Sequence, residues 1–147
     1  MKLVIQRVKK AKVTEEENGT VVGQINHGLF ILVGITHSDT ENIVQKLADK
    51  LLNLRIMDKE KGKMGLSIQD TQGEILVVSQ FTLYADTKSG RRPSFIDAAD
   101  TDHARKLYDK FIERLKDSGL KIENGSFGNY MEIESIADGP VTIILES

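Results

Sequence analysis

The stretch "GLFILVGI", residues 28–35, contains only apolar residues and glycine. It is too short for a typical helix, it is rich in branched side chains, and it begins with glycine. A short continuous apolar run of this kind is typical of a strand with both faces covered, because a half-solvated strand alternates apolar and polar residues. We therefore predict that residues 28–35 form a strand buried on both faces.

Further strand-like segments lie before and after this run. The strands are expected near residues 2–9, 11–17, 20–26, 28–36, 74–84, 130–137 and 140–146. Between two of them, Asn18-Gly19 predicts a hairpin turn, because both residue types tolerate positive φ. The adjacent acidic run Glu15–Glu17 is expected to be a solvated tip of that hairpin.

Two helices are indicated by apolar residues at helical spacing. The segment "SDTE", residues 38–41, matches a capping box at the start of the first helix. The second helix is expected from about Asp100 to Ser118, where Gly119 ends it. The apolar positions are Ile43, Val44, Leu47, Leu51 and Leu54 in the first helix, and Ala104, Leu107, Tyr108, Phe111, Ile112 and Leu115 in the second.

The order of these elements predicts the fold class. Several strands are followed by a helix, a strand, a helix and further strands, which indicates an α+β fold. We expect a mixed, largely antiparallel β-sheet that curls toward a barrel, with two helices packed on it. The length of 147 residues suits a single domain over residues 1–147.

The composition excludes several kinds of site. The chain has no cysteine, which removes disulfides and thiolate metal ligands. It contains no glycine-rich nucleotide fingerprint and no phosphate-binding loop. The three histidines, His27, His37 and His103, lack the spacing of metal ligands. We expect neither a metal nor a cofactor.

Charge and the N-terminal segment bear on partners and location. The apolar run near the N-terminus, Leu3–Ile5, stops after three residues, which matches neither a signal peptide nor a membrane span. We expect a soluble, cytoplasmic protein that makes no membrane contact.

The formal net charge of −2 gives no overall field that would attract nucleic acid. Two local groups of basic residues are either solvated segments or contacts to phosphate. They are Lys9, Lys10 and Lys12, and Lys88, Arg91 and Arg92.

The segment "SQFTLYAD", residues 79–86, carries polar side chains at the end of an apolar strand. On the strand expected over residues 74–84, Gln80 and Thr82 project from one face and Phe81 from the other. One interpretation is a strand with a solvated face. The other is a hydroxyl and a carboxamide that orient water or a polar ligand. No histidine or carboxylate lies within the strand to activate Thr82, so a nucleophilic role needs a base from elsewhere.

The segment "DGPVTIILE", residues 138–146, places Gly139-Pro140 between two expected strands. Glycine tolerates unusual φ values, and proline fixes φ and removes a hydrogen-bond donor. The pair is either a plain turn or a rigid loop that presents backbone carbonyls to a ligand.

Together these motifs resemble the D-aminoacyl-tRNA deacylases. The resemblance rests on "SQFTLYAD", on "GRRPSF" at 90–95 and on "DGPVT" at 138–142. It extends over essentially the whole chain, in the same order and spacing. The other matching segments are "QRV" at 6–8, "LRI" at 54–56, "GKM" at 62–64, the run from Gly73 to Phe95, and "SFG" at 126–128.

The resemblance implies a homodimeric enzyme without a cofactor. Its members hydrolyse the ester that joins a D-amino acid to the terminal adenosine of tRNA, and they remove glycine mischarged on tRNA-Ala. The residues matching the family's catalytic motif are Ser79, Gln80, Phe81 and Thr82. A Gly-cis-Pro pair, here Gly139 and Pro140, enters the partner subunit's pocket and rejects L-amino acids, and Arg7 orients that pair.

The same resemblance favours the phosphate reading for Lys88, Arg91 and Arg92, which follow the catalytic motif and are expected to contact tRNA. The chain departs from the usual family pattern at Gly65, Asn129-Tyr130 and Ala137, and the last of these raises the question of how the Gly-Pro loop is supported. A non-catalytic tRNA-binding or editing-accessory module and a dimeric scaffold are the alternative functions.

Overall fold

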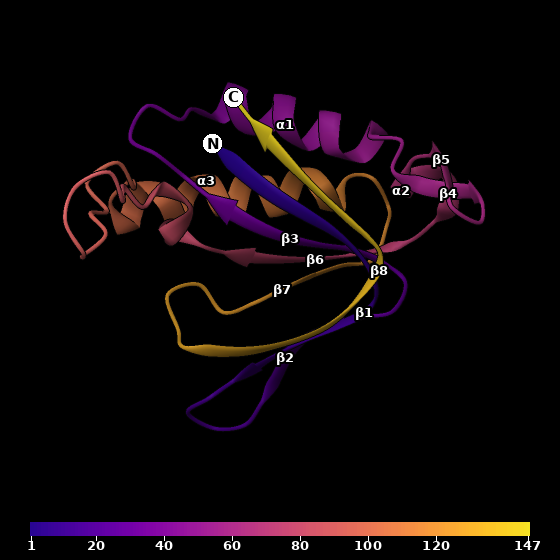
Figure 1. Ribbon diagram of the computed structural model, residues 1–147, viewed down its shortest axis with the longest axis horizontal. Coiled ribbons are helices and arrows are strands. Elements are labelled where there is room, and N and C mark those ends of the chain that lie inside the picture. The colour runs from indigo at the N-terminus through magenta and orange to yellow at the C-terminus, as the bar shows by residue number, and fades with distance from the viewer.

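The computed structural model describes residues 1–147 (Figure 1). The strands are β1 Lys2–Glu15, β2 Val21–Ile25, β3 Gly28–Gly34, β4 Met57–Glu60, β5 Lys63–Leu66, β6 Glu74–Ser79, β7 Ile122–Asn124 and β8 Met131–Glu146. The helices are α1 Glu41–Asn53, α2 Ile68–Thr71 and α3 Thr101–Lys116, and Phe81–Tyr84 form a 3₁₀ turn, η1. None of the helices is long and apolar enough to cross a membrane.

Six strands form one mixed sheet in the order β2-β1-β3-β6-β7, and β8 pairs with β1. β1 is antiparallel to β2, β3 and β8, whereas β6 is parallel to both β3 and β7. Because β1 and β8 are long and curved, the sheet folds over on itself (Figure 1). The curled, mixed and largely antiparallel sheet predicted from the sequence is confirmed.

The central strand β3 is buried on both faces, as predicted. Its alternate residues Leu29, Ile31 and Val33 belong to a core of 24 buried residues that includes the apolar faces of α1 and α3. Phe30 points the other way, into a second core of seven residues enclosed by the curl of the sheet. In Figure 1 the helices lie above β3 and β6, and the curved halves of β1, β2 and β8 lie below.

The two predicted helices exist, but the capping box predicted at residues 38–41 is wrong. The helix α1 begins at Glu41 after Thr40, whose hydroxyl accepts a hydrogen bond from Ile43 N. Asp39 is 3% exposed and binds the N-terminal ammonium of Met1, which holds it outside the helix. The helix therefore starts two residues later than a cap at Ser38 requires.

The sequence did not predict the shortest elements or the continuity of β1. The β4–β5 hairpin, α2 and β7 have too few residues for a periodic pattern to show. The segments expected as separate strands at 2–9 and 11–17 are one strand, β1. The β1–β2 hairpin turns where predicted, and Gly19 has a φ of +66°.

We predict that the second core stabilises the fold. Leu76 on β6 is fully buried in the second core. Leu76→Ala should lower the free energy of unfolding by about 2–5 kcal/mol, because the truncation leaves a cavity. Urea denaturation measures this loss. The control Val21→Ala, at an exposed strand position, should change the free energy of unfolding by less than about 0.5 kcal/mol. Equal losses in the two variants would contradict a stabilising role of the second core.

Candidate active site

The strand β6 ends at Ser79, and the chain then leaves the sheet. Gln80 N donates to Val33 O at 2.7 Å, which is the last β6–β3 bond, and η1 follows. The predicted strand through residue 84 is therefore wrong beyond Ser79. The reason is that β3 itself ends at Gly34, so no neighbouring strand remains to pair with a longer β6.

The turn places Gln80 and Thr82 in contact by a route other than strand alternation. Gln80 Nε2 donates to Thr82 Oγ1 at 2.6 Å. No histidine or carboxylate forms a hydrogen bond with the Thr82 hydroxyl. The amides of Phe81 and Thr82 begin the turn, where intrahelical acceptors are lacking, and no side chain caps it. The site thus presents main-chain donors beside two polar side chains.

Close packing against β3 fixes the position of η1. A Cβ atom on Gly34 would lie 2.9 Å from Leu83 Cβ and 3.3 Å from Gln80 O, so only glycine allows this approach. Lys2 Nζ donates to Leu83 O at 3.3 Å and lies 5.3 Å from the centre of the Tyr84 ring. Burial, with the negative charges of Asp39 and Glu146, raises the pKa of Tyr84 to about 12, so its phenol stays neutral.

A cavity of ≈ 390 Å³ opens beside the turn. Its walls are largely apolar, and they include Phe81 and Phe95, whose rings meet edge to face at 5.1 Å. Thr82 is not a wall residue and reaches the cavity only through Gln80. The lining residues are Val33, Ile35, Ser79, Gln80, Phe81, Phe95, Ala98, Ala99, Thr101, Ala104, Phe127 and Gly128.

The wall formed by Phe127 and Gly128 is held from outside the cavity. Asn129 Nδ2 donates to Glu15 Oε1 at 2.9 Å, which ties this loop to the end of β1. Hydrogen bonds from Ser126, then Asn129 and Asn18, lower the pKa of Glu15. Asn129, a departure from the family pattern, therefore has a structural partner. The sequence indicated Glu15 only as part of a solvated tip and Phe127 only as part of a matching segment, because their roles depend on contacts between distant segments.

The basic residues Lys88, Arg91 and Arg92 lie on an exposed loop that starts and ends near the cavity. Asp86 and Ser94 pair at the base of this loop, with N–O distances of 2.7 and 2.9 Å. Just beyond, Phe95 packs on Phe81. The other basic group, at Lys9–Lys12, lies on β1, where Lys12 is paired with Glu134.

Gly139-Pro140 lies in a bulge of β8 and not in a turn between two strands, so the predicted break at 138–139 is wrong. Pairing with β1 passes from Gln6↔Thr142 to Val8↔Ala137, so two residue steps on β1 face five on β8. The peptide bond is cis, Gly139 has a φ of +127°, and Pro140 is exposed.

Arg7 fills the gap opposite this bulge. It is 4% exposed, and its Nε donates to Asp138 O at 3.2 Å. Its Nη1 donates to Ile56 O at 2.9 Å. The guanidinium also pairs with Asp58 at 2.6 Å and with the carboxylate of Asp138 at 3.1 Å. The structure thus brings Arg7, Gly139 and Pro140 together as one unit.

This unit and the cavity lie far apart within one chain. Ser79 aligns across the sheet with Val33, Leu3 and Leu145. Pro140 is five residues along β8 from Leu145, and three strand spacings separate β8 from β6. At about 4.8 Å per strand and about 3.3 Å per residue, the separation along the sheet is roughly 20 Å.

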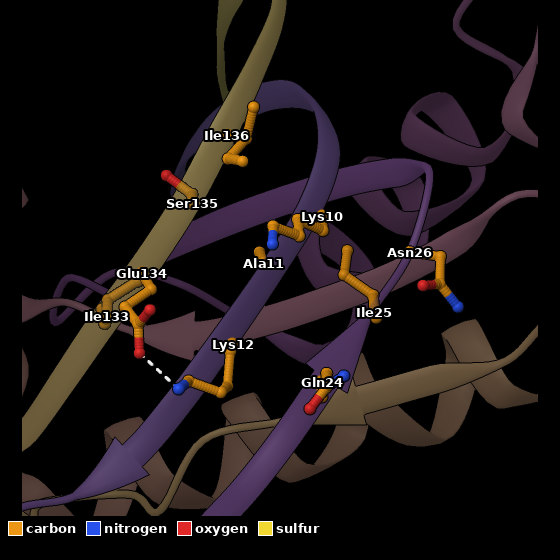
Figure 2. A pocket seen from close by; sticks show the side chains of 10 residues that line it. All are labelled: Lys10, Ala11, Lys12, Gln24, Ile25, Asn26, Ile133, Glu134, Ser135 and Ile136. Carbon is orange, nitrogen blue, oxygen red and sulfur yellow. Dashed lines mark ion pairs between the residues drawn. The ribbon is translucent and has the colours of Figure 1, made fainter.

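A larger hollow of ≈ 530 Å³ lies on the curled half of the sheet, between β1, β2 and β8 (Figure 2). Lys12 and Glu134 form an ion pair across it, and Ile133 and Ile136 contribute apolar surface. Lys10 and Lys12 of the first basic group line it, but it contains none of the residues of the motifs at 79–82 and 139–140, so size alone does not identify the candidate site here.

Comparison with known proteins decides the family. The model of the D-Tyr-tRNA(Tyr) deacylase family matches residues 4–146. The chain belongs to this family. Two similar relatives are named D-aminoacyl-tRNA deacylase. The protein of Geobacillus sp. (strain WCH70) is 54% identical over all of this chain and 95% of its own length. That of Bacillus velezensis is 55% identical over all of this chain and 99% of its own.

Solved structures show the same fold. A structure of the c-Myc DNA unwinding element binding protein has a TM-score of 0.91 and 42% identity, and the match covers 100% of this chain and 99% of that one. A second structure, of a probable eukaryotic D-amino acid tRNA deacylase, has a TM-score of 0.87 at 17% identity, over 98% of this chain and 97% of that one. The deacylase family fold is thus shared at low sequence identity.

We predict that the Glu15 contact to the cavity wall is lost in acid. Because the folded-state pKa of Glu15 is lowered, the contact stabilises the fold above the unfolded-state pKa and is lost as pH falls through the folded-state pKa. Glu15→Gln should therefore melt below the parent at pH 7, and the difference should shrink toward pH 3. Thermal melts of both proteins across this range measure it, with Glu17→Gln as the control. A difference independent of pH would contradict the assignment.

Proposed function

We propose that this protein hydrolyses the ester bond of D-aminoacyl-tRNA. The observation that carries the proposal is the match of the deacylase family over residues 4–146 together with an apolar cavity at the motif Ser79–Thr82. Water attacks the ester carbonyl carbon, and the bond from that carbon to the ribose oxygen breaks. The products are tRNA with a free terminal hydroxyl and a D-amino acid.

The main chain at the start of η1 supplies the catalytic stabilisation in this proposal. The carbonyl oxygen gains negative charge in the transition state, and fixed amides at Phe81 and Thr82 are suited to bind it. Thr82 accepts a hydrogen bond from Gln80 at 2.6 Å and acts on the ester through Gln80. It does not act as a nucleophile, because no base contacts its hydroxyl. The 2′-hydroxyl of the tRNA ribose assists the attack.

Selectivity is proposed to come from Gly139 and Pro140. Their carbonyls hold the amino group of the substrate, and the backbone leaves no room for an L side chain. Glycine has no side chain to exclude, so glycyl-tRNA, including glycine mischarged on tRNA-Ala, is hydrolysed as well. This is specificity by steric exclusion of the wrong substrate. Arg7 holds the pair in place through Asp138.

The separation of roughly 20 Å along the sheet supports a homodimer with a site shared between subunits. The Pro140 of one chain is exposed and remote from its own cavity, and in this proposal it enters the cavity of a second copy. Exposed apolar residues on the same strand favour such an association. They are Ile133, Ile136 and Ile144.

The exposed loop of Lys88, Arg91 and Arg92 is proposed to bind the phosphates of tRNA near its 3′ end. Its two ends are fixed beside the cavity by the Asp86–Ser94 pair and by Phe95. Contacts of this kind position the nucleic acid without reading its sequence, and they weaken with salt.

We predict that the Phe81 amide matters more than the Phe81 side chain. The parent should release D-tyrosine from D-tyrosyl-tRNA and glycine from glycyl-tRNA but spare L-tyrosyl-tRNA, with or without a chelator. Phe81→Pro removes the amide hydrogen at a first helical position, which proline tolerates. It should lose about 10²–10³-fold in kcat relative to the control Phe81→Ala, which keeps the amide. No turnover of D-tyrosyl- or glycyl-tRNA by the parent would refute the function; equal losses would refute the amide's role.

Mixed dimers test the shared site. Phe81→Pro and Pro140→Ala are each expected to be impaired, the first in rate and the second in rejection of L-tyrosyl-tRNA. If the pair acts across subunits, a heterodimer of the two contains one fully intact site, and random mixing should restore roughly one quarter of the parent's sites. If Pro140 serves its own subunit, no intact site forms, and the mixture retains the defects of its components.

A further inference from the structure

The guanidinium of Arg7 is held between two separate parts of the chain. On one side it binds the bulge of β8, through the main-chain and side-chain oxygens of Asp138 at 3.2 and 3.1 Å. On the other side Nη1 donates to Ile56 O at 2.9 Å and to Asp58 Oδ1 at 2.6 Å. Its third nitrogen, Nη2, lies 3.3 Å from the place where Gly139 would carry a Cβ atom. The position of Arg7 and that of the bulge are therefore linked.

Asp58 is anchored on the β4–β5 hairpin and not on Arg7 alone. Its second oxygen, Oδ2, accepts a hydrogen bond from Gly62 N at 2.9 Å, which closes the hairpin over the carboxylate. This bond from Gly62, together with Arg7, lowers the pKa of Asp58 although burial opposes it. The carboxylate thus stays charged at neutral pH and has a fixed direction. The hairpin holds Arg7 from the side opposite to the bulge.

We propose that Asp58 is a positioning residue that sets the orientation of Gly139-Pro140 through Arg7 and thereby the stereochemical selectivity of the site. This inference rests on the proposed function. Without Asp58, Arg7 keeps its bonds to Ile56 and Asp138, so the bulge survives. The Arg7 guanidinium then loses one of the two bonds that hold it on the side opposite to the bulge. A looser Gly-Pro pair excludes an L side chain less well, whereas D-aminoacyl esters still fit.

The selectivity ratio distinguishes this role from a general structural one. Asp58→Ala should retain the rate on D-tyrosyl-tRNA within about twofold, and its preference for D- over L-tyrosyl-tRNA should fall roughly tenfold, as expected for losing one hydrogen bond to a charged group. Asp58→Asn, which keeps one acceptor, should fall between Asp58→Ala and the parent. The control is Glu60→Ala on the same hairpin, which removes a surface ion pair with Lys63 and should leave the ratio unchanged.

Heterodimers show in which subunit Asp58 acts. The first heterodimer joins an Asp58→Ala chain to a Phe81→Pro chain, each with its own purification tag. Its only active cavity lies in the Asp58→Ala chain. That cavity receives Gly139-Pro140 from the other chain, in which Asp58 is intact. It should have the parent's selectivity. A dimer of the parent with the Asp58→Ala/Phe81→Pro double variant should show the relaxed selectivity. The reverse pattern, or no difference between the two dimers, would refute action through the Gly-Pro pair.

A spectroscopic measurement decides the positioning role even if the protein hydrolyses none of the three esters, an outcome that refutes only the proposed function. In ¹H–¹⁵N spectra, Asp58→Ala should shift or broaden the Arg7 Nε–H and Gly139 N–H signals, and Glu60→Ala should leave both in place. If both signals are unmoved in Asp58→Ala, Asp58 does not position the pair.

Discussion

Burial of β3 on both faces is the constraint on which the rest of the structure depends. A strand with apolar residues on both sides needs a cover on each side. On one side α1 and α3 supply this cover, and their apolar faces belong to the larger core. On the other side no helix is available, so β1, β2 and β8 curl over the sheet and enclose the smaller core around Phe30 and Leu76. The curl explains why β1 and β8 must be long.

The candidate site arises where this central sheet ends. β6 ends at Ser79, which pairs with Val33, and the chain then forms a tight turn. The turn leaves amides without partners inside it, next to an apolar cavity, and donors of this kind are most effective where water is largely excluded. A site built from the main chain needs no reactive side chain, which fits a chain without cysteine.

The curl also separates the two halves of the proposed site. The β8 bulge opposite Arg7 lies at the bend of the sheet, and the cavity lies at the far end of β6. The two elements lie apart within one chain, and the proposed selectivity therefore includes a second copy. Arg7 is central to this arrangement, since it links the bulge to the β4–β5 hairpin through Asp138 and Asp58.

The sequence by itself determined the two-sided burial of residues 28–35, both long helices, the curled mixed sheet and the family, because apolar periodicity and long matching motifs are local in the chain. The tertiary structure alone decided the end of β6 at Ser79, since strand length depends on the neighbour β3. It also decided that Thr40 and not Ser38 caps α1, because the N-terminal ammonium of Met1, 38 positions earlier in the chain, binds Asp39. The contacts of Glu15 with Asn129 and of Asp58 with Arg7 join residues more than fifty positions apart or on separate hairpins, and no local pattern records such pairs.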